Sequence, residues 1–171
     1  MRWTTGCASL LLFATAACGG GSGDTGGLEG DEKDAAAAIS TYFEGEGMQA
    51  TEASCIGDGL VEQFGIAHLK DLGVLDEKLK PQPGKTRELK AFSSAADAPK
   101  AATITVDCVT VAGVMKEQYQ GIDDATADCL AKAFGRERMI DSMAAGLQGL
   151  AADDTPAEVT AEMSKCVPDK K

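Results

Sequence analysis

An apolar run near the amino terminus, from Leu10 to Ala17, sets how the rest of the chain is interpreted. One basic residue, Arg2, and no acid precede it, and the stretch from Cys7 to Ala17 contains only apolar or small side chains. As a helix this stretch would extend about 16 Å, which is too short for a hydrocarbon core of about 30 Å. Such a run is typical of a signal peptide, so we assign residues 1–17 to export and leave them out of the fold.

The residues that end this run, Thr15-Ala16-Ala17-Cys18-Gly19, resemble the lipobox of bacterial lipoproteins. That family usually has leucine three positions before the cysteine, where this chain has Thr15. The resemblance implies that Cys18 becomes the first residue of the mature chain and carries a diacylglycerol thioether. The protein would then be anchored to the cell membrane or the outer membrane, facing away from the cytoplasm. The alternative is ordinary signal cleavage, which would give a soluble secreted protein.

A glycine-rich tether follows the anchor, so that residues 18–30 comprise Cys18 and a segment with almost nothing to bury. Residues 21–26 match the pattern G-x-G-x-x-G, but that fingerprint needs a strand before it and a helix beginning within it. Here a cleavage site precedes the pattern instead. We therefore do not expect the chain to bind a dinucleotide. The sequence contains no other cofactor-binding motif.

The mature chain is strongly acidic. Removing residues 1–17 takes away Arg2 and no acid, which leaves 15 basic and 27 acidic residues and a net charge of −12. This charge argues against nucleic acid as a partner and against binding to anionic lipids through a basic surface. It favours solubility. About 140 residues remain after the tether, enough for one domain with its own core.

Four cysteines remain when Cys7 in the signal and Cys18 at the anchor are set aside. They are Cys55, Cys108, Cys129 and Cys166. An even number in an exported chain predicts disulfides, and four cysteines allow three pairings. The nearest two are 21 positions apart, whereas structural zinc sites use closely spaced pairs, so the spacing disfavours zinc. The C-x-x-C motif of redox catalysts is absent.

The two halves of the chain share a pattern that predicts an internal repeat. Residues 47–55 align without gaps on residues 121–129, and both stretches end in a cysteine. Phe64-Gly65 then matches Phe134-Gly135, with four fewer residues in between, about one helical turn. The alternative is chance similarity in a chain rich in alanine and glycine.

The repeat also favours one disulfide pairing. In each half a proline opens a later segment that ends in a cysteine, 99–108 and 156–166. Each half closes on itself in the same way if the pairs are Cys55–Cys108 and Cys129–Cys166. We predict this pairing.

Helical periodicity runs through the rest of the chain. Apolar residues recur at helical spacing over 31–44, 49–64 and 66–72. Residues 103–106 have strand propensity, but the parallel segment 156–166 begins with a capping box at Thr155 and with proline at the first helical position. That parallel favours helix over 99–120.

We therefore predict an all-α fold of about six or seven short helices in one domain over residues 31–171. The helices would form two similar, disulfide-closed units, at about 31–108 and 109–167. An apolar stripe at helical spacing comprises Met139, Ile140, Met143, Leu147 and Leu150. We assign this stripe to the core rather than to a methionine-rich binding groove.

His68 is the one histidine, and Asp71 follows it by three residues. A histidine–aspartate couple can act as a general base when a nucleophile lies within reach. The chain has no G-x-S-x-G motif, and no serine stands in a distinctive setting. We favour a structural histidine, and the alternative is a small envelope hydrolase that uses His68 with an acidic residue.

Two acidic clusters are candidates for a calcium-binding site. They are Asp123-Asp124 with Asp128, and Asp153-Asp154. Both lack the spacing of an EF-hand loop, and both precede or begin predicted helices, where acids are favoured by the helix dipole. We interpret them as helix caps and predict no metal site.

Together these features predict an exported, lipid-anchored protein of the cell envelope that acts as a non-catalytic binding or interaction module. The expected partners are the membrane, through the lipid at Cys18, and another envelope protein. Nucleic acid is not expected as a partner. The remaining assigned residues are the four disulfide cysteines, and no catalytic, cofactor or metal residues are assigned.

Overall fold

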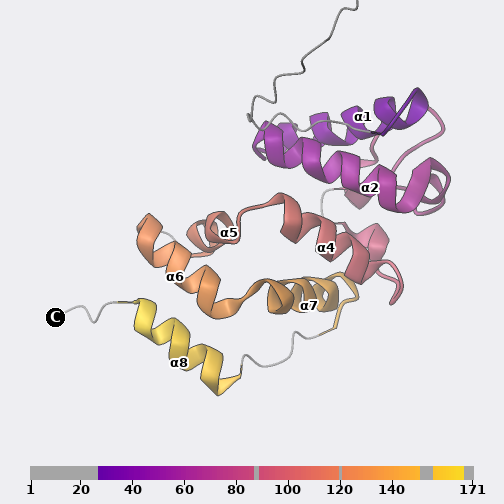
Figure 1. The fold of residues 1–171 in the computed structure, drawn as a ribbon. Helices are drawn as coiled ribbons and strands as arrows, with labels where there is room; N and C mark the ends of the chain where they lie inside the picture. The colour runs from indigo at the N-terminus through magenta and orange to yellow at the C-terminus, as the bar shows by residue number, and fades with distance from the viewer. Residues whose placement is uncertain (1–26, 87–88, 120, 151–155, 168–171) are drawn as a thin grey trace, which may run out of the picture.

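The computed structural model describes residues 27–86, 89–119, 121–150 and 156–167, and these residues form an all-α fold (Figure 1). The elements are α1 (Asp31–Gly45), α2 (Ala50–Asp71), α3 (Pro83–Thr86), the 3-10 turn η1 (Lys90–Phe92), α4 (Ala98–Cys108), α5 (Val111–Gln118), α6 (Asp124–Phe134), α7 (Arg136–Leu147) and α8 (Ala157–Cys166). The predicted all-α fold is confirmed. Residues 103–106, despite their strand propensity, lie within α4.

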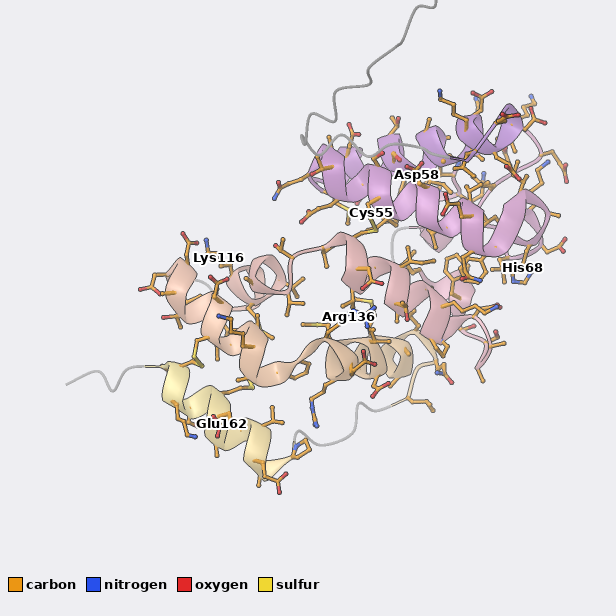
Figure 2. The ribbon with its side chains drawn as sticks, in the orientation of Figure 1. Cys55, Asp58, His68, Lys116, Arg136 and Glu162 are labelled. Atoms are coloured by element: carbon orange, nitrogen blue, oxygen red, sulfur yellow. A yellow bond between two sulfur atoms is a disulfide. The ribbon has the colours of Figure 1, made fainter. Side chains whose placement is uncertain are left out.

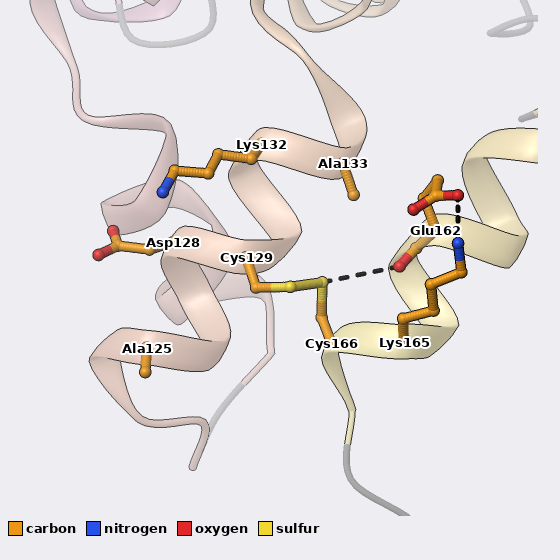
Figure 3. Close-up of a pocket in the computed structure, with 8 residues that line it drawn as sticks. All are labelled: Ala125, Asp128, Cys129, Lys132, Ala133, Glu162, Lys165 and Cys166. Atoms are coloured by element: carbon orange, nitrogen blue, oxygen red, sulfur yellow. Dashed lines mark hydrogen bonds and ion pairs between the residues drawn. A yellow bond between two sulfur atoms is a disulfide. The ribbon is translucent and has the colours of Figure 1, made fainter.

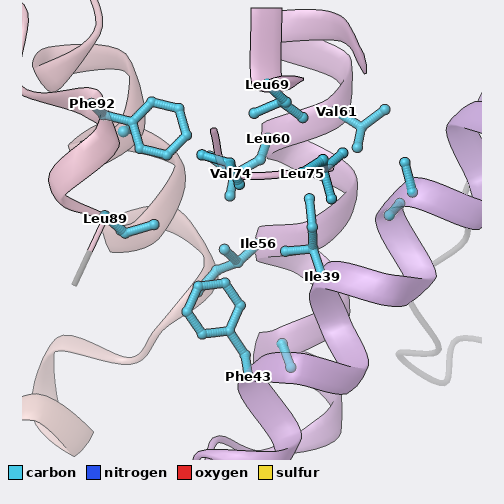
Figure 4. Close-up of a cluster of buried hydrophobic side chains, with 14 of the residues drawn as sticks. Ile39, Phe43, Ile56, Leu60, Val61, Leu69, Val74, Leu75, Leu89 and Phe92 are labelled. Atoms are coloured by element: carbon cyan, nitrogen blue, oxygen red, sulfur yellow. The ribbon is translucent and has the colours of Figure 1, made fainter. Parts of the chain in front are cut away.

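The α1–α2 hairpin forms the core of the first unit. The residues that α1 buries are Ala35, Ala36, Ile39, Ser40 and Phe43. They recur every three or four positions, as expected for one face of a helix. Figure 4 shows Ile39 and Phe43 against Ile56 and Leu60 of α2.

The segment between α2 and α4 completes this core. It contributes Val74, Leu75, Leu89 and Phe92, all buried in the same cluster (Figure 4). This connection is therefore part of the core, although its prolines and serines are typical of exposed loops. The core also reaches back to Leu28, which is 8% exposed and precedes the predicted domain start by three residues. One side chain of the predicted tether thus belongs to the core, although the neighbouring Glu29 and Gly30 are exposed.

Two smaller clusters organise the second half. One lies between α4 and α7 and comprises Ala98, Ala102, Val106, Ile140 and Ala144. The other lies among α5, α6 and α8 and comprises Met115, Ala127, Leu130 and Cys166. Because α4 packs on both α2 and α7, it joins the two units. An ion pair reinforces this junction, since Arg136 Nε donates to Asp107 Oδ1 at 2.7 Å.

Both predicted disulfides are confirmed. Cys55 of α2 is bonded to Cys108 of α4, and Cys129 of α6 is bonded to Cys166 of α8. The bonds join residues 53 and 37 positions apart. Chain-entropy estimates for loops of this size give about 4 kcal/mol of stabilisation for each bond. Each unit is therefore closed on itself by a covalent bond.

Two pairs of aligned glycines have similar backbone geometry. Gly47 and Gly121 have φ of 99° and 88°, and α2 and α6 begin three residues after them, at Ala50 and Asp124. Further along, Gly65 has φ 70° and ψ 157°, and its counterpart Gly135 has φ 83° and ψ 147°.

The predicted apolar stripe on α7 is core for most of its length. Ile140 is buried, and Met139, Met143 and Leu147 are partly buried against the two smaller clusters. The assignment of Leu150 to the core is wrong, because this side chain is 60% exposed. The helix ends at Leu147, and Gly149, with φ 69°, turns the chain away before Leu150 is reached.

Candidate functional site

His68 lies on the short helical segment that follows the break in α2 at Gly65 (Figure 2). Gly65 has a backbone conformation that residues with a side chain rarely adopt, and it redirects the helix. The segment beyond it carries His68 to the amino-terminal end of α4. A glycine break thus positions the one histidine of the chain.

The partner of His68 is Asp97, the residue before α4, and the predicted partner Asp71 is not used. His68 Nε2 lies 3.3 Å from Asp97 Oδ1, and the two side chains are 41% and 13% exposed. Ser94 completes the cluster: its hydroxyl donates to Asp97 Oδ2 at 2.8 Å and accepts from the Asp97 backbone N–H at 3.0 Å. The position of Asp97 at a helix amino terminus also favours its negative charge.

Aromatic packing fixes the other side of the imidazole. The Phe64 ring stacks on His68, with centroids 5.8 Å apart and planes 20° apart. Phe64 also packs on the buried Phe92, at 4.8 Å between centroids. Lys100 Nζ lies 6.0 Å from the centroid of the Phe64 ring. The imidazole is therefore held between an aromatic ring and a carboxylate.

This geometry differs from that of a nucleophilic triad. In a triad the imidazole accepts the proton of the nucleophile, and the carboxylate orients the imidazole from its other side. Here the Ser94 hydroxyl donates to the carboxylate. The His68–Asp97 contact joins the end of α2 to the start of α4, whereas both Ser94–Asp97 hydrogen bonds lie within the segment before α4.

The sequence contains a signal for this cluster. Ser94 and Asp97 are three positions apart and precede a helix with proline in its first turn, as in a capping motif. Spacing along the chain gave no indication that His68, 29 positions before Asp97, lies beside them.

The acidic residues at the start of α6 act in capping and pairing. Asp123 Oδ1 accepts the Thr126 backbone N–H at 2.8 Å. Hydrogen bonds from the Thr126 side chain and backbone lower the pKa of Asp123. Asp124 forms an ion pair with Lys116 of α5. The capping interpretation is confirmed for Asp123, whereas Asp153 and Asp154 lie outside the described residues.

A groove runs between α6 and α8 beside the second disulfide (Figure 3). Its lining residues are Ala125, Asp128, Cys129, Lys132, Ala133, Glu162, Lys165 and Cys166. Glu162 and Lys165 form an ion pair with each other on α8. The groove therefore combines small apolar side chains, both signs of charge and an accessible disulfide.

Within the described ranges, no group of three or more histidine, cysteine, aspartate or glutamate side chains is placed to hold a metal ion. Over the same residues, no helix has the length and apolar character needed to cross a bilayer. The predicted lipidation site, Cys18, lies outside the described residues. No family model matches the chain, and neither the curated proteins nor the solved structures compared with it gave a match.

Proposed function

We propose that this chain is an exported, lipid-anchored protein of the cell envelope that acts as a non-catalytic interaction module. The observation that carries the proposal is the pair of disulfides, Cys55–Cys108 and Cys129–Cys166. Such bonds form and persist in oxidising compartments outside the cytoplasm. The lipobox-like residues that end at Cys18 supply the route to that compartment and the attachment to lipid.

Metabolic labelling with palmitate tests the anchor. We expect label on the mature chain, a membrane-fraction location, and loss of both in Cys18→Ala. Cys7→Ala is the matched control, because Cys7 lies in the segment that export would remove. Labelling that survives in Cys18→Ala, or a chain in the soluble cell fraction that still begins at Met1, would contradict the proposal.

The geometry around His68 supports a non-catalytic role. The imidazole is stacked on Phe64 and paired with Asp97, and the nearby Ser94 hydroxyl donates its proton to the same carboxylate. A general base needs a nucleophile whose proton it can accept. Of these contacts, the one between His68 and Asp97 connects the end of α2 to the start of α4.

A small hydrolase is the second candidate, and the His68–Asp97 contact favours it, because a half-exposed imidazole beside a carboxylate is a common base arrangement. Hydrolysis of ester and amide substrates, measured for the wild type and for His68→Ala, distinguishes a hydrolase from a non-catalytic module. We expect no turnover that depends on His68. Turnover that is lost in His68→Ala and retained in Lys100→Ala, a change at a neighbouring cation, would establish the hydrolase.

The partner proposed for the module is another envelope protein. Photo-crosslinking in the native envelope, with the reactive residue at Lys33 on α1 or at Lys132 on α6, tests both units separately. We expect one protein to be captured at one of these positions and not at the other. Absence of any crosslinked protein at either position would favour a structural lipoprotein without a protein partner.

We also propose that the two units are copies of one ancestral unit. The proposal is supported by the matched glycine conformations at Gly47 and Gly121 and at Gly65 and Gly135. It is further supported by the equivalent places of the four cysteines on α2, α4, α6 and α8. Sequences of homologues in which the two halves resemble each other more closely would test it.

A further inference from the structure

We propose that α8 is a releasable arm, held in place by the Cys129–Cys166 bond and freed when a dithiol reduces that bond. The Cys55–Cys108 bond has a different role, because packing alone holds α4. The two disulfides thus occupy equivalent places in their units and differ in what they control. The inference concerns the second unit alone and is independent of the proposed lipid anchor.

Packing accounts for the difference. In α8 the one residue classed as buried is Cys166 itself, while Met163 is partly buried against the α6 cluster. In α4 the buried residues are Ala98, Ala101, Ala102, Thr105 and Val106. α4 also packs closely on α2, where a methyl group added to Gly59 would lie 2.7 Å from Ile104 Cγ2. Without the sulfur bond, α8 would be attached mainly through Met163 and the side chain of Cys166, whereas α4 would keep five buried residues.

Among the residues that the structure describes, no hydrogen bond or ion pair joins α8 to α6. The hydrogen bonds and the ion pair of its described side chains stay within α8 and the proline before it: Lys165 with Glu162, Ser164 with Thr160, and Thr160 with Pro156. Cys166 Sγ contacts the Glu162 carbonyl, again within α8. At ten residues, α8 is also shorter than the roughly 12–15 residues that an isolated helix needs to be even marginally stable in water. Without the bond we expect it to leave α6 and unfold.

The bond is placed where a thiol can reach it. Cys129 is half-buried and lines the groove (Figure 3). The residues one helical turn before and after it are alanines, Ala125 and Ala133, whose short side chains cover little of the disulfide. Cys166 is 8% exposed. Cys129 is therefore the more exposed residue of the pair, and we expect attack at its sulfur. Two lysines, Lys132 and Lys165, and two acids, Asp128 and Glu162, line the same groove, so its charges balance and do not repel a thiolate.

The exchange balances as an ordinary two-electron reaction. A thiolate of the dithiol attacks Cys129 Sγ, forms a mixed disulfide and releases Cys166 as a thiolate, which takes up a proton. The second thiol of the reagent then attacks the mixed disulfide, releases Cys129 and leaves the reagent oxidised. Two electrons and two protons pass from the dithiol to the two cysteines.

Hydrogen exchange on the full chain tests the proposal, with the double variants Cys129→Ser/Cys166→Ser and Cys55→Ser/Cys108→Ser compared with the wild type. In the first, we expect amides of α8 to exchange within about tenfold of the rate of an unstructured peptide, while α1, α2 and α4 keep their protection. In the second, we expect α4 and α8 both to remain protected. Reduction of the wild type with dithiothreitol, followed by alkylation, should reproduce the loss in α8, and reoxidation without alkylation should restore it.

Three results would overturn the proposal. Protection of α8 in Cys129→Ser/Cys166→Ser would show that packing holds the helix. Loss of protection throughout α5, α6 and α7 in the same variant would show that the bond stabilises the whole unit rather than one arm. Release of α8 in Met163→Ala, with the disulfide mapped as intact, would show that the bond does not retain it.

Discussion

Gly57 of α2 lies so close to α1 that a methyl group on its Cα would be 2.5 Å from Ser40 Oγ and 2.6 Å from the Ala36 carbonyl oxygen. The Ser40 hydroxyl itself donates to that carbonyl at 2.9 Å. No room is left at this crossing for a larger side chain, because the nearest atoms include backbone. The contact between the two longest helices of the first unit thus depends on small residues.

Gly57→Ala should destabilise the protein by about 1–3 kcal/mol, because the added methyl group forces the two helices apart. Urea unfolding followed by circular dichroism measures this change. Gly146→Ala is the matched control: it lies in α7 with nothing within 4 Å of the added atom, and it should raise stability by up to about 1 kcal/mol. A Gly57→Ala protein as stable as the wild type would contradict the close approach.

Gly65 and Gly135 should both resist substitution. Their φ and ψ values lie in a region that is essentially restricted to glycine, so alanine at either position should cost about 1–3 kcal/mol. Space is not the cause, because nothing lies within 4 Å of a Cβ at either site. Thermal unfolding of the two single variants measures the effect, and similar losses would support the equivalence of the two breaks.

The contribution of the N-cap of α6 to stability can be tested by substitution, and the start of α2, which has no side-chain cap, provides the comparison. Asp123 accepts a backbone hydrogen bond from Thr126, whereas Gln49, at the aligned position, makes no side-chain cap. Asp123→Ala should lower the thermal midpoint. Gln49→Asp should raise stability by about 0.5–1 kcal/mol, because it adds the missing cap.

The capping effect of Asp123 should also depend on pH. Its pKa is lowered in the folded state, so its stabilisation is present above the unfolded value of about 3.8 and is lost as the pH falls through the lower folded value. The difference between wild type and Asp123→Ala should therefore be constant near neutrality and shrink in acid. A difference that grew in acid would contradict the assignment.

Asp58 should show the opposite pH dependence. Burial, followed by repulsion from Glu62 one turn along α2, raises the pKa of Asp58. A raised pKa means that the contribution of the group to stability is present below about 3.8 and is lost as the pH rises through the folded value. Asp58→Asn should therefore stabilise the protein by about 0.2–0.5 kcal/mol at pH 7, a small gain because solvent screens the half-exposed carboxylate.

The control is the same substitution measured in acid. At a pH below the unfolded value of Asp58, the wild type and Asp58→Asn should be equally stable. Glu62→Gln should give part of the same gain at neutral pH, because it removes the repulsion and leaves the burial. A gain for Asp58→Asn that persists unchanged in acid would have another cause.

Much of the fold could be predicted from the sequence, because its signals are local. Residue type predicts the glycines that end or break helices, Gly45 and Gly65. The parallel spacing of the cysteines in the two halves predicts the disulfide pairing. The segment from Val74 to Phe92 could not be predicted, because its buried residues lack helical or strand periodicity. They become core only when the α1–α2 hairpin provides a surface for them.

The candidate site was predicted less well for the same reason. The sequence singled out His68, and its nearest acid along the chain was Asp71, but the carboxylate it meets belongs to Asp97. That contact depends on the direction of the chain after Gly65 and on the packing of α4 against α2. Neither can be read from spacing, since both follow from tertiary packing.

The two disulfides also determine how the protein responds to tension. If the chain is pulled from its ends, the segments of 53 and 37 residues that the bonds close cannot extend while the sulfur atoms remain joined. Only the chain outside these loops lengthens. Reduction would then release roughly 180 Å and 125 Å of additional contour length, two steps that single-molecule force measurements can distinguish by size.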